Sequence, residues 1–386
     1  MAKWFTALVM GMTMLLFGAA GGILGPLLPA IEREFEIDTR WSGLLFSASF
    51  AGAVIAIMAS GYFADRFGKK RLFLILLAGL ALAYAGYEFA PTFAILAIAC
   101  LLAGALGGAM EGLCSAVVAD LDPFRVDRNI NLLQVAFCAG AVLAVVVAAS
   151  LYKQSVSWRA LYGLFALLAG LIWLMGLRMQ VPSAPAAAPI RLPMAFRMLC
   201  DPALLRLAFA ICLYVGSEMS LAWLISPIMQ KMYDYSELRA LWAVGLFWAA
   251  MGFSRLGVAM LCHRYSSLVL VRLFILGGAC SYVVLLLPAG AWHLWLGIIL
   301  AGTTFSGIWP LLVSLANARY PAYSGTATAV MVTSGTIGGL VGPYLATQLL
   351  HGDPAARSPL LFMAGLFAGI ACVMLPLRND SPKGKR

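Results

Sequence analysis

Twelve apolar stretches, each long enough to cross a lipid bilayer, constrain this chain more than any other feature. A helix that spans the hydrocarbon core needs about 20 apolar residues. Of the 386 residues, 63% are hydrophobic and 11% are charged, and a water-soluble fold could not bury that much apolar surface. The sequence therefore predicts an all-α integral membrane protein with twelve transmembrane helices, at 5–31, 41–63, 72–90, 93–120, 129–152, 157–178, 203–230, 239–261, 268–288, 291–316, 323–350 and 358–377.

The basic residues are distributed unevenly between the predicted loops. If the N-terminus lies inside, 18 of the 26 Lys and Arg fall on the cytoplasmic side and seven outside, while Arg255 falls within a span. Cytoplasmic loops of membrane proteins carry such an excess of positive charge. We therefore expect both termini in the cytoplasm of a bacterium, with the chain in its inner (plasma) membrane. The net charge of +10 then reflects topology, and we expect no nucleic-acid partner.

A linker rich in proline and alanine separates two sets of six spans. Prolines prevent a continuous helix through residues 179–202. The chain thus divides into an N-terminal six-helix bundle at 1–178 and a C-terminal six-helix bundle at 203–378, followed by a cytoplasmic tail at 379–386. Weak similarity between the loops after the second and eighth spans indicates a repeat. Two six-helix repeats around a site at mid-membrane are typical of transporters.

The loop "GYFADRFGKKR" after the second span carries the most specific motif. By this motif the chain resembles the major facilitator superfamily, whose members consist of two six-helix bundles that move about a central site in alternating access. The resemblance implies that the loop latches the cytoplasmic side as well as fixing topology. Asp65 would accept hydrogen bonds from a helix N-terminus, and Arg66 would pair with an acid such as Asp120. The motif residues are Gly61, Asp65, Arg66, Gly68, Lys69 and Lys70.

Two glutamates, Glu111 and Glu218, lie deep within predicted spans. An ionisable group at that depth costs about 2.5–3.5 kcal/mol on insertion scales, so it normally faces a cavity or a partner. We predict that both bind the solute and that at least one carries a proton. The alternative is a protonated glutamate bonded to a neighbouring helix. Tyr214 lies one turn before Glu218 on the same helix face, and Trp223 is either a ligand or an interfacial anchor.

The segment "NINLLQVAFCAG" resembles the fucose–proton symporter-like branch of the superfamily, and "YVGSE" resembles the seventh helix of sugar transporters. The resemblance implies that Gln134 and Glu111 line the cavity. The alternative for Gln134 is a hydrogen bond between helices. The chain departs from the fucose symporter in two places, because residues 5–31 contain no acid and Phe137 stands where that branch has an amide.

Three further residues are candidates in the C-terminal half. The segment "FSGIWPLL" predicts a bend at which Ser306 and Trp309 line the cavity, although Pro310 alone explains a bend. Arg255 lies about two turns from the end of its span. It either snorkels to the interface or is buried as a charge partner in a cytoplasmic gate.

These features predict a secondary active transporter of a small polar organic solute, a sugar or sugar derivative, by proton symport. The alternative is an exporter of amphipathic compounds by proton antiport. A sensor or assembly factor on the same scaffold would need an output domain. No nucleophile–base pair, nucleotide motif or metal-binding cluster indicates an enzyme, so we expect no cofactor and no metal. The expected partners are the solute, protons and the lipid bilayer, and the expected state is a monomer.

Overall fold

The structure is a computed structural model. It describes residues 2–122, 126–154, 156–181, 198, 200–261, 264–287, 292–320, 323–353 and 355–375, without the side chains of 2, 57–67, 126, 127, 259, 324 and 325.

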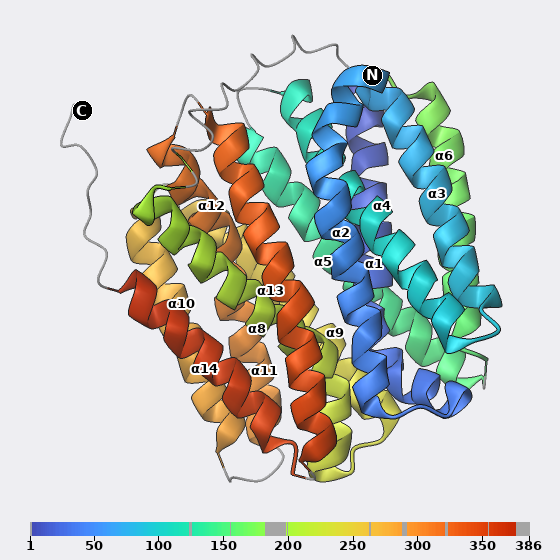
Figure 1. Cartoon of the computed structure of the whole chain (residues 1–386), viewed down its shortest axis with the longest axis vertical. Coiled ribbons are helices and arrows are strands. Elements are labelled where there is room, and N and C mark those ends of the chain that lie inside the picture. Colours follow the sequence, from blue (N-terminus) through green and yellow to red (C-terminus); the bar gives the residue numbers. More distant parts are fainter. Residues whose placement is uncertain are drawn as a thin grey trace.

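All regular elements within these residues are helices, and they form two halves (Figure 1). The N-terminal half contains α1 (Ala2–Phe35), α2 (Thr39–Phe67), α3 (Lys69–Phe89), α4 (Phe93–Leu121), α5 (Val126–Lys153) and α6 (Arg159–Arg178). The C-terminal half contains α8 (Pro202–Tyr233), α9 (Glu237–Leu261), α10 (Ser267–Leu286), α11 (Trp292–Phe305), α12 (Ile308–Arg319), α13 (Ser324–Gly352) and α14 (Arg357–Met374). We call the end of the bundle where α1 begins the terminal end, and the opposite end the distal end.

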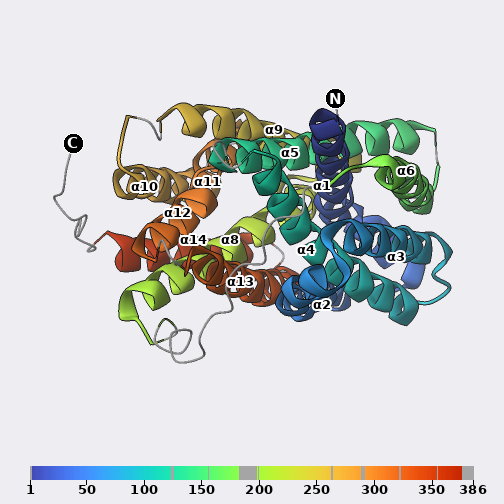
Figure 2. The same ribbon diagram turned by 90° about the horizontal axis from the view of Figure 1, so that it is seen from above.

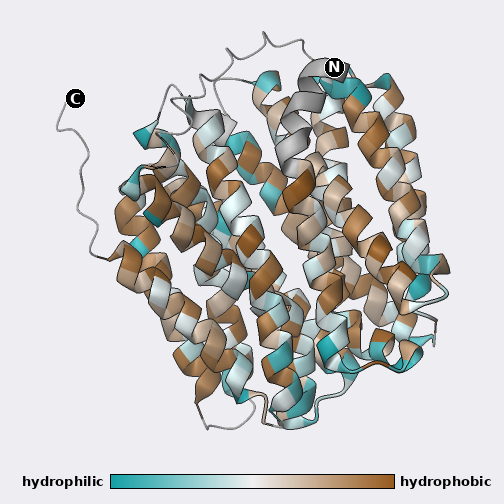
Figure 3. Cartoon of the chain, in the orientation of Figure 1, coloured by the Kyte–Doolittle hydropathy of each residue, from teal (hydrophilic) through white to brown (hydrophobic). Residues whose placement is uncertain are grey.

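The helices have the length and composition of membrane spans. Eleven candidate spans lie among the described residues, with α11 and α12 together forming one of them. The 29 residues of α2 supply a further helix of sufficient length. Apolar residues predominate along the middle of the bundle, whereas polar residues are more frequent toward its two ends (Figure 3). The predicted fold class is therefore confirmed.

The predicted bend in the tenth span is a break between two helices. The α-helix α11 ends at Phe305 and α12 begins at Ile308, with Ser306 and Gly307 in a turn between them. Pro310 explains the position of the break, because a proline cannot donate to the carbonyl four residues earlier and its ring clashes with that carbonyl. The carbonyl concerned is that of Ser306.

The two halves meet mainly along three pairs of helices. Helix α2 packs on α13, α5 packs on α9, and α1 packs on α8. Seen from the terminal end, α5 and α9 lie side by side on one flank, and α2 and α13 on the other (Figure 2). These contacts place side chains from α4, α5, α8 and α9 near one another at the centre of the bundle.

Glycines allow the closest approaches between helix backbones. A Cβ at Gly140 on α5 would overlap the backbone carbonyl of Leu15 on α1. A Cβ at Gly338 on α13 would overlap the carbonyl of Cys212 on α8 in the same way. Small residues have this role in membrane helix packing, where close contact supplies much of the association energy.

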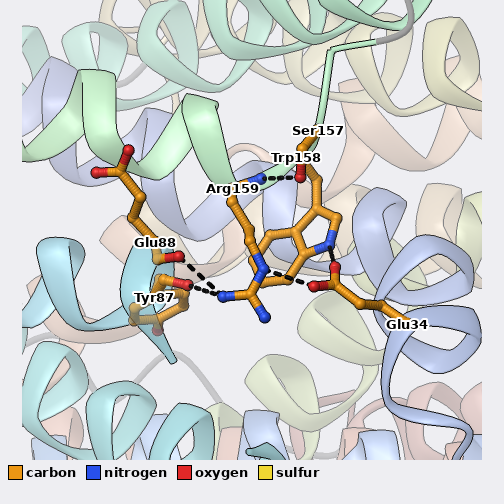
Figure 4. Close-up of polar contacts among 6 residues, drawn as sticks. All are labelled: Glu34, Tyr87, Glu88, Ser157, Trp158 and Arg159. Carbon is orange, nitrogen blue, oxygen red and sulfur yellow. Dashed lines mark hydrogen bonds and ion pairs between the residues drawn. The ribbon is translucent and has the colours of Figure 1, made fainter. Parts of the chain in front are cut away.

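The distal end of the N-terminal half is held by a cluster around Arg159 (Figure 4). Arg159 Nε donates to Glu34 Oε1 at 2.6 Å, and its Nη1 donates to the carbonyl oxygen of Glu88 at 2.8 Å. Trp158 Nε1 donates to the other oxygen of Glu34 at 2.5 Å. The cluster therefore joins the end of α1 to the end of α3 and the start of α6.

The two halves are closed against each other at the distal end. Arg33 forms an ion pair with Glu237 across the halves, and Gln348 Nε2 donates to the carbonyl of Arg40 at 3.1 Å. At the terminal end, a cavity of about 530 Å³ lies between α1, α4 and α5, with Lys3, Gly11 and Leu133 in its lining. The conformation is therefore closed distally, with open space at the terminal end.

Asp201, which precedes α8, is expected to contribute to stability in a pH-dependent way. Partial burial raises its pKa, but hydrogen bonds from Arg319 Nε and the Tyr320 hydroxyl, both at 2.6 Å, and from the Ala203 N–H lower it from 3.8 to about 2. Because the folded pKa lies below the unfolded value, ionised Asp201 stabilises the fold above pH 3.8 and loses this effect as pH falls through about 2. We expect Asp201→Asn to lower the free energy of unfolding by about 1 kcal/mol at pH 7.

Thermal unfolding of both proteins between pH 7 and pH 2 measures this contribution. The difference between them should shrink below pH 4, and a difference that stays constant down to pH 2 would contradict the assignment.

Candidate functional site

A chain of hydrogen bonds crosses the contact between the two halves. Gln134 Nε2 on α5 donates to Glu111 Oε1 on α4 at 3.1 Å. Arg255 Nη1 on α9 donates to Gln134 Oε1 at 2.9 Å and approaches the Gln134 carbonyl oxygen at 3.4 Å. An acid, an amide and a base from three helices thus form one polar cluster inside a membrane-spanning bundle.

The second intramembrane acid lies close to this cluster. Glu218 on α8 is 4% exposed and interacts electrostatically with Arg255, Tyr214 and Glu111. The Tyr214 hydroxyl donates to the carbonyl of Phe305 at 2.9 Å, which fixes the ring beside Glu218. Among the described residues, Arg255 makes no direct ion pair with either glutamate. We refer to Glu111, Gln134, Glu218 and Arg255 as the central cluster.

Helix packing explains why the central cluster forms. Gly252 on α9 faces Cys138 on α5, where an added Cβ would lie 3.1 Å from the cysteine Cβ. This close contact brings Arg255, one turn further along α9, against Gln134, one turn back on α5. Arg255 is 7% exposed, so it is buried in the seam between the halves and does not snorkel to the interface.

Two buried donors of α9 have no hydrogen-bond partner among the residues that the structure describes. They are Arg255 Nε and Trp248 Nε1, and Trp248 is 2% exposed. The two residues are seven positions apart, so they share one face of α9 about 10 Å apart along its axis. The Trp248 ring packs edge-on against the Phe137 ring, with 5.5 Å between the ring centroids. The Phe137 ring packs in the same way against Phe17, with 5.7 Å between centroids. An aromatic wall therefore adjoins the central cluster.

Apart from Tyr214, which lies beside Glu218, three predicted ligands lie outside the central cluster. Trp223 is stacked on Phe46 of α2 at 4.0 Å, and its Nε1 donates to the carbonyl of Gly21 on α1 at 3.0 Å. It therefore joins the two halves on the distal side. Ser306 Oγ donates to Ser254 Oγ at 2.8 Å within the C-terminal half. Trp309 is half-buried and packs against the apolar core.

The loop motif is only partly within the described side chains. Those of Gly61, Asp65 and Arg66 lie outside them, so the latch remains a prediction. Gly68 precedes α3 with a φ of 78°, a conformation that favours glycine.

The remaining loop bases have partners in the N-terminal half. Lys69, the first residue of α3, forms an ion pair with Asp120, the acid that the sequence suggests as a partner for Arg66. Lys70 donates to the carbonyl of Leu177 at 2.8 Å. Both bases thus tie helices of the same half together.

Sequence reasoning did not identify Trp248 as part of the site. Its spacing of seven residues from Arg255, on the same helix face, was the available signal. Within the described residues, no group of three or more His, Cys, Asp or Glu side chains could hold a metal ion. The site can thus donate and accept hydrogen bonds and hold protons on its acids.

A model of the Major Facilitator Superfamily matches residues 10–343. The chain belongs to the major facilitator superfamily. This transporter is therefore an integral multi-pass membrane protein that carries small molecules, and not an enzyme. Its arrangement of two six-helix halves around a polar centre agrees with that membership.

Known relatives of this transporter differ in what their names say they carry. It is 26% identical over 385 residues to the 3-(3-hydroxy-phenyl)propionate transporter of Escherichia coli, covering 94% of this chain and 91% of that protein. It is 28% identical to the D-xylose transporter of Levilactobacillus brevis, a match that spans 44% of this chain and 37% of that protein. The crystal structure of the human organic anion transporter MFSD10 shares the fold, with a TM-score of 0.75 at 22% identity over 97% of this chain and all of that one.

Proposed function

We propose that this chain is a secondary active transporter that moves a small hydroxyl-bearing solute, a sugar or sugar derivative, by alternating access with proton symport. The observation that carries the proposal is the hydrogen-bonded chain from Glu111 through Gln134 to Arg255, because it lies where the halves meet. A solute bound there contacts both halves, and its binding energy can couple to their movement.

Hydroxyl groups suit the acceptors of the central cluster. Glu111 and Glu218 supply carboxyl oxygens, and the half-buried Glu111 is the more accessible of the two. Solute sites typically combine apolar walls with a few polar groups that fix orientation, and Phe17, Phe137 and Trp248 supply such a wall. The named substrates of the xylose and hydroxyphenylpropionate relatives also carry hydroxyl groups, which supports this solute class.

Charge asymmetry supports the proposed topology. With both termini in the cytoplasm, the terminal end faces inward, and the cavity lined by Lys3 and Leu133 opens toward the cytoplasm. The distal ion pair between Arg33 and Glu237 then closes the outer side. We propose the bacterial inner membrane as the location and the monomer as the transporting unit.

Uptake into proteoliposomes under an inward proton gradient tests the proposal. We expect accumulation of a labelled sugar or sugar derivative that a proton uncoupler abolishes. Glu111→Gln keeps the shape of the side chain but cannot exchange a proton, so gradient-driven accumulation should fall at least tenfold while exchange of solute between the two sides continues.

Glu88→Gln is the matched control, because Glu88 lies on α3 with its carboxylate directed away from the Arg159 cluster (Figure 4). This variant should accumulate solute like the wild type. Gradient-driven accumulation that is unchanged in Glu111→Gln would rule out the coupling role of Glu111.

Export of amphipathic compounds is the second candidate function. The aromatic wall of Phe17, Phe137 and Trp248 favours it, because such rings bind apolar solutes without strict geometry. Reversing the proton gradient distinguishes the two functions. A symporter accumulates solute inside the vesicles when the gradient drives protons inward. An antiporter accumulates solute when the gradient drives protons outward.

A further inference from the structure

Arg255 presents one edge of its guanidinium group without a strong partner. Nη1 is used by the side chain and backbone of Gln134. Nε has no partner among the described residues, and Nη2 contacts the sulfur of Met251 at 3.6 Å. Nε and Nη2 lie on the same side of the planar group, and that side matches the two oxygens of a carboxylate.

A buried donor without an acceptor is costly. Leaving one unsatisfied is unfavourable, and more so when the donor is charged. Arg255 is 7% exposed, and neither Glu111 nor Glu218 makes a direct ion pair with it among the described residues. The chain thus holds a cation at its centre whose strongest hydrogen-bonding edge is not used by its own acids.

We propose that Arg255 binds a carboxylate group of the transported solute side-on through Nε and Nη2. This inference rests on the proposed function and names the solute class as a small monocarboxylate, such as a sugar acid. Trp248 Nε1, two turns along the same face of α9, donates to a hydroxyl or carbonyl oxygen at the other end of the solute. The separation of about 10 Å along the axis fits a solute of one ring.

The charges of the site then require a proton to accompany the carboxylate. The groups that interact with Arg255 or Glu218 are Glu111 on α4, Cys138 on α5, Tyr214 on α8 and Tyr282 on α10. Cys114 on α4 interacts with Glu111. Arg255 balances one ionised glutamate, so the empty site is neutral when the other glutamate is protonated. A buried uncompensated charge is strongly unfavourable.

Binding therefore exchanges one counter-ion of Arg255 for another. The solute carboxylate takes the place of the ionised glutamate, and that glutamate takes up one proton from water. No covalent bond of the solute forms or breaks, and the site gains one anion and one proton. A neutral sugar would leave the glutamate ionised and would bind without this proton.

Binding measurements on the full chain in lipid nanodiscs test the inference. The probes are two matched pairs, D-glucuronate with D-glucose and benzoate with benzyl alcohol, each titrated by calorimetry and with a pH-indicator dye. We expect the acid of at least one pair to bind ten times more tightly than its neutral partner, with uptake of about one proton per molecule bound.

Two variants separate the roles of the donors. Arg255→Gln should remove both the preference for the acid and the proton uptake. Trp248→Phe keeps an aromatic ring but loses the donor, so it should weaken acid binding roughly 3- to 10-fold while proton uptake per bound acid stays the same. If Arg255→Gln does not fold, the wild-type comparison and Trp248→Phe still decide the question.

Three results would overturn the inference. They are neutral probes that bind the wild type as tightly as the acids, acids that do not bind at millimolar concentration, and an acid preference that survives in Arg255→Gln. Proton-driven uptake of a neutral sugar without acid binding would leave the proposed function standing and remove this inference. Acid binding without proton-driven uptake would support the binding role of Arg255 and remove the proposed proton symport.

Discussion

Replacing Gly140 with alanine is expected to destabilise the protein far more than a methyl group added at a glycine that faces open space. The new Cβ would overlap the carbonyl oxygen, carbonyl carbon and Cα of Leu15. These are backbone atoms of a buried helix, so no side chain can rotate away and α1 must move off α5. Overpacking of this kind costs about 1–3 kcal/mol or more, and we expect the unfolding temperature to fall by roughly 3–5 °C.

Gly170→Ala on α6 is the matched control. An added Cβ there meets no atom within 4 Å, and alanine is favoured over glycine inside a helix by about 0.5–1 kcal/mol. Its unfolding temperature should stay the same or rise slightly. Thermal unfolding in detergent compares the two variants, and an equal loss in both would show that the α1–α5 approach is not the cause.

Replacing Trp223 with alanine is expected to open the distal end. Its ring stacks on Phe46 and lies 5.4 Å from Phe50, and its Nε1 donates to the Gly21 carbonyl. All three partners belong to the opposite half, so these contacts exist only while the distal end is closed. Removing a buried Trp side chain costs about 3–5 kcal/mol, which corresponds to a shift of roughly 100-fold or more toward the distally open state.

Hydrogen exchange of the distal parts of α2 and α13 measures this shift. Exchange should be faster in Trp223→Ala than in the wild type. Trp173→Ala is the control, because Trp173 also donates to a backbone carbonyl at 3.0 Å, that of Leu74, but within one half. It should lower stability without raising distal exchange, and equal distal exchange in both variants would contradict a role of Trp223 in closure.

Bilayer physics explains why most of the fold could be predicted. A span must be apolar over a fixed length, so 93–120 was predicted where α4 runs from Phe93 to Leu121. Backbone chemistry likewise predicted the bend near Pro310. The two intramembrane acids were identified because an ionisable group inside a bilayer is costly enough to need a reason.

The partners of these residues could not be predicted in the same way. Arg255 and Gln134 are 121 positions apart, and their contact depends on how α5 packs against α9. The pattern of apolar spans does not reveal which helices pack together. The sequence therefore left two alternatives for Arg255, which were snorkelling to the interface and burial as a charge partner. Trp248 was missed because a tryptophan within a span looks like any other apolar residue until its Nε1 is found without an acceptor in the described part of the chain.

Arg33 and Glu34 are neighbours in α1, yet their side chains have partners in different halves. Arg33 pairs with Glu237 of the C-terminal half, whereas Glu34 binds Trp158 and Arg159 of its own half. Opening of the distal end must therefore break the ion pair of Arg33 and can leave the hydrogen bonds of Glu34 intact. The boundary between the two moving halves therefore passes between two consecutive side chains. A one-residue insertion or deletion there would place a different side chain at the contact between the halves, and a residue suited to a contact within one half would take the position of Arg33.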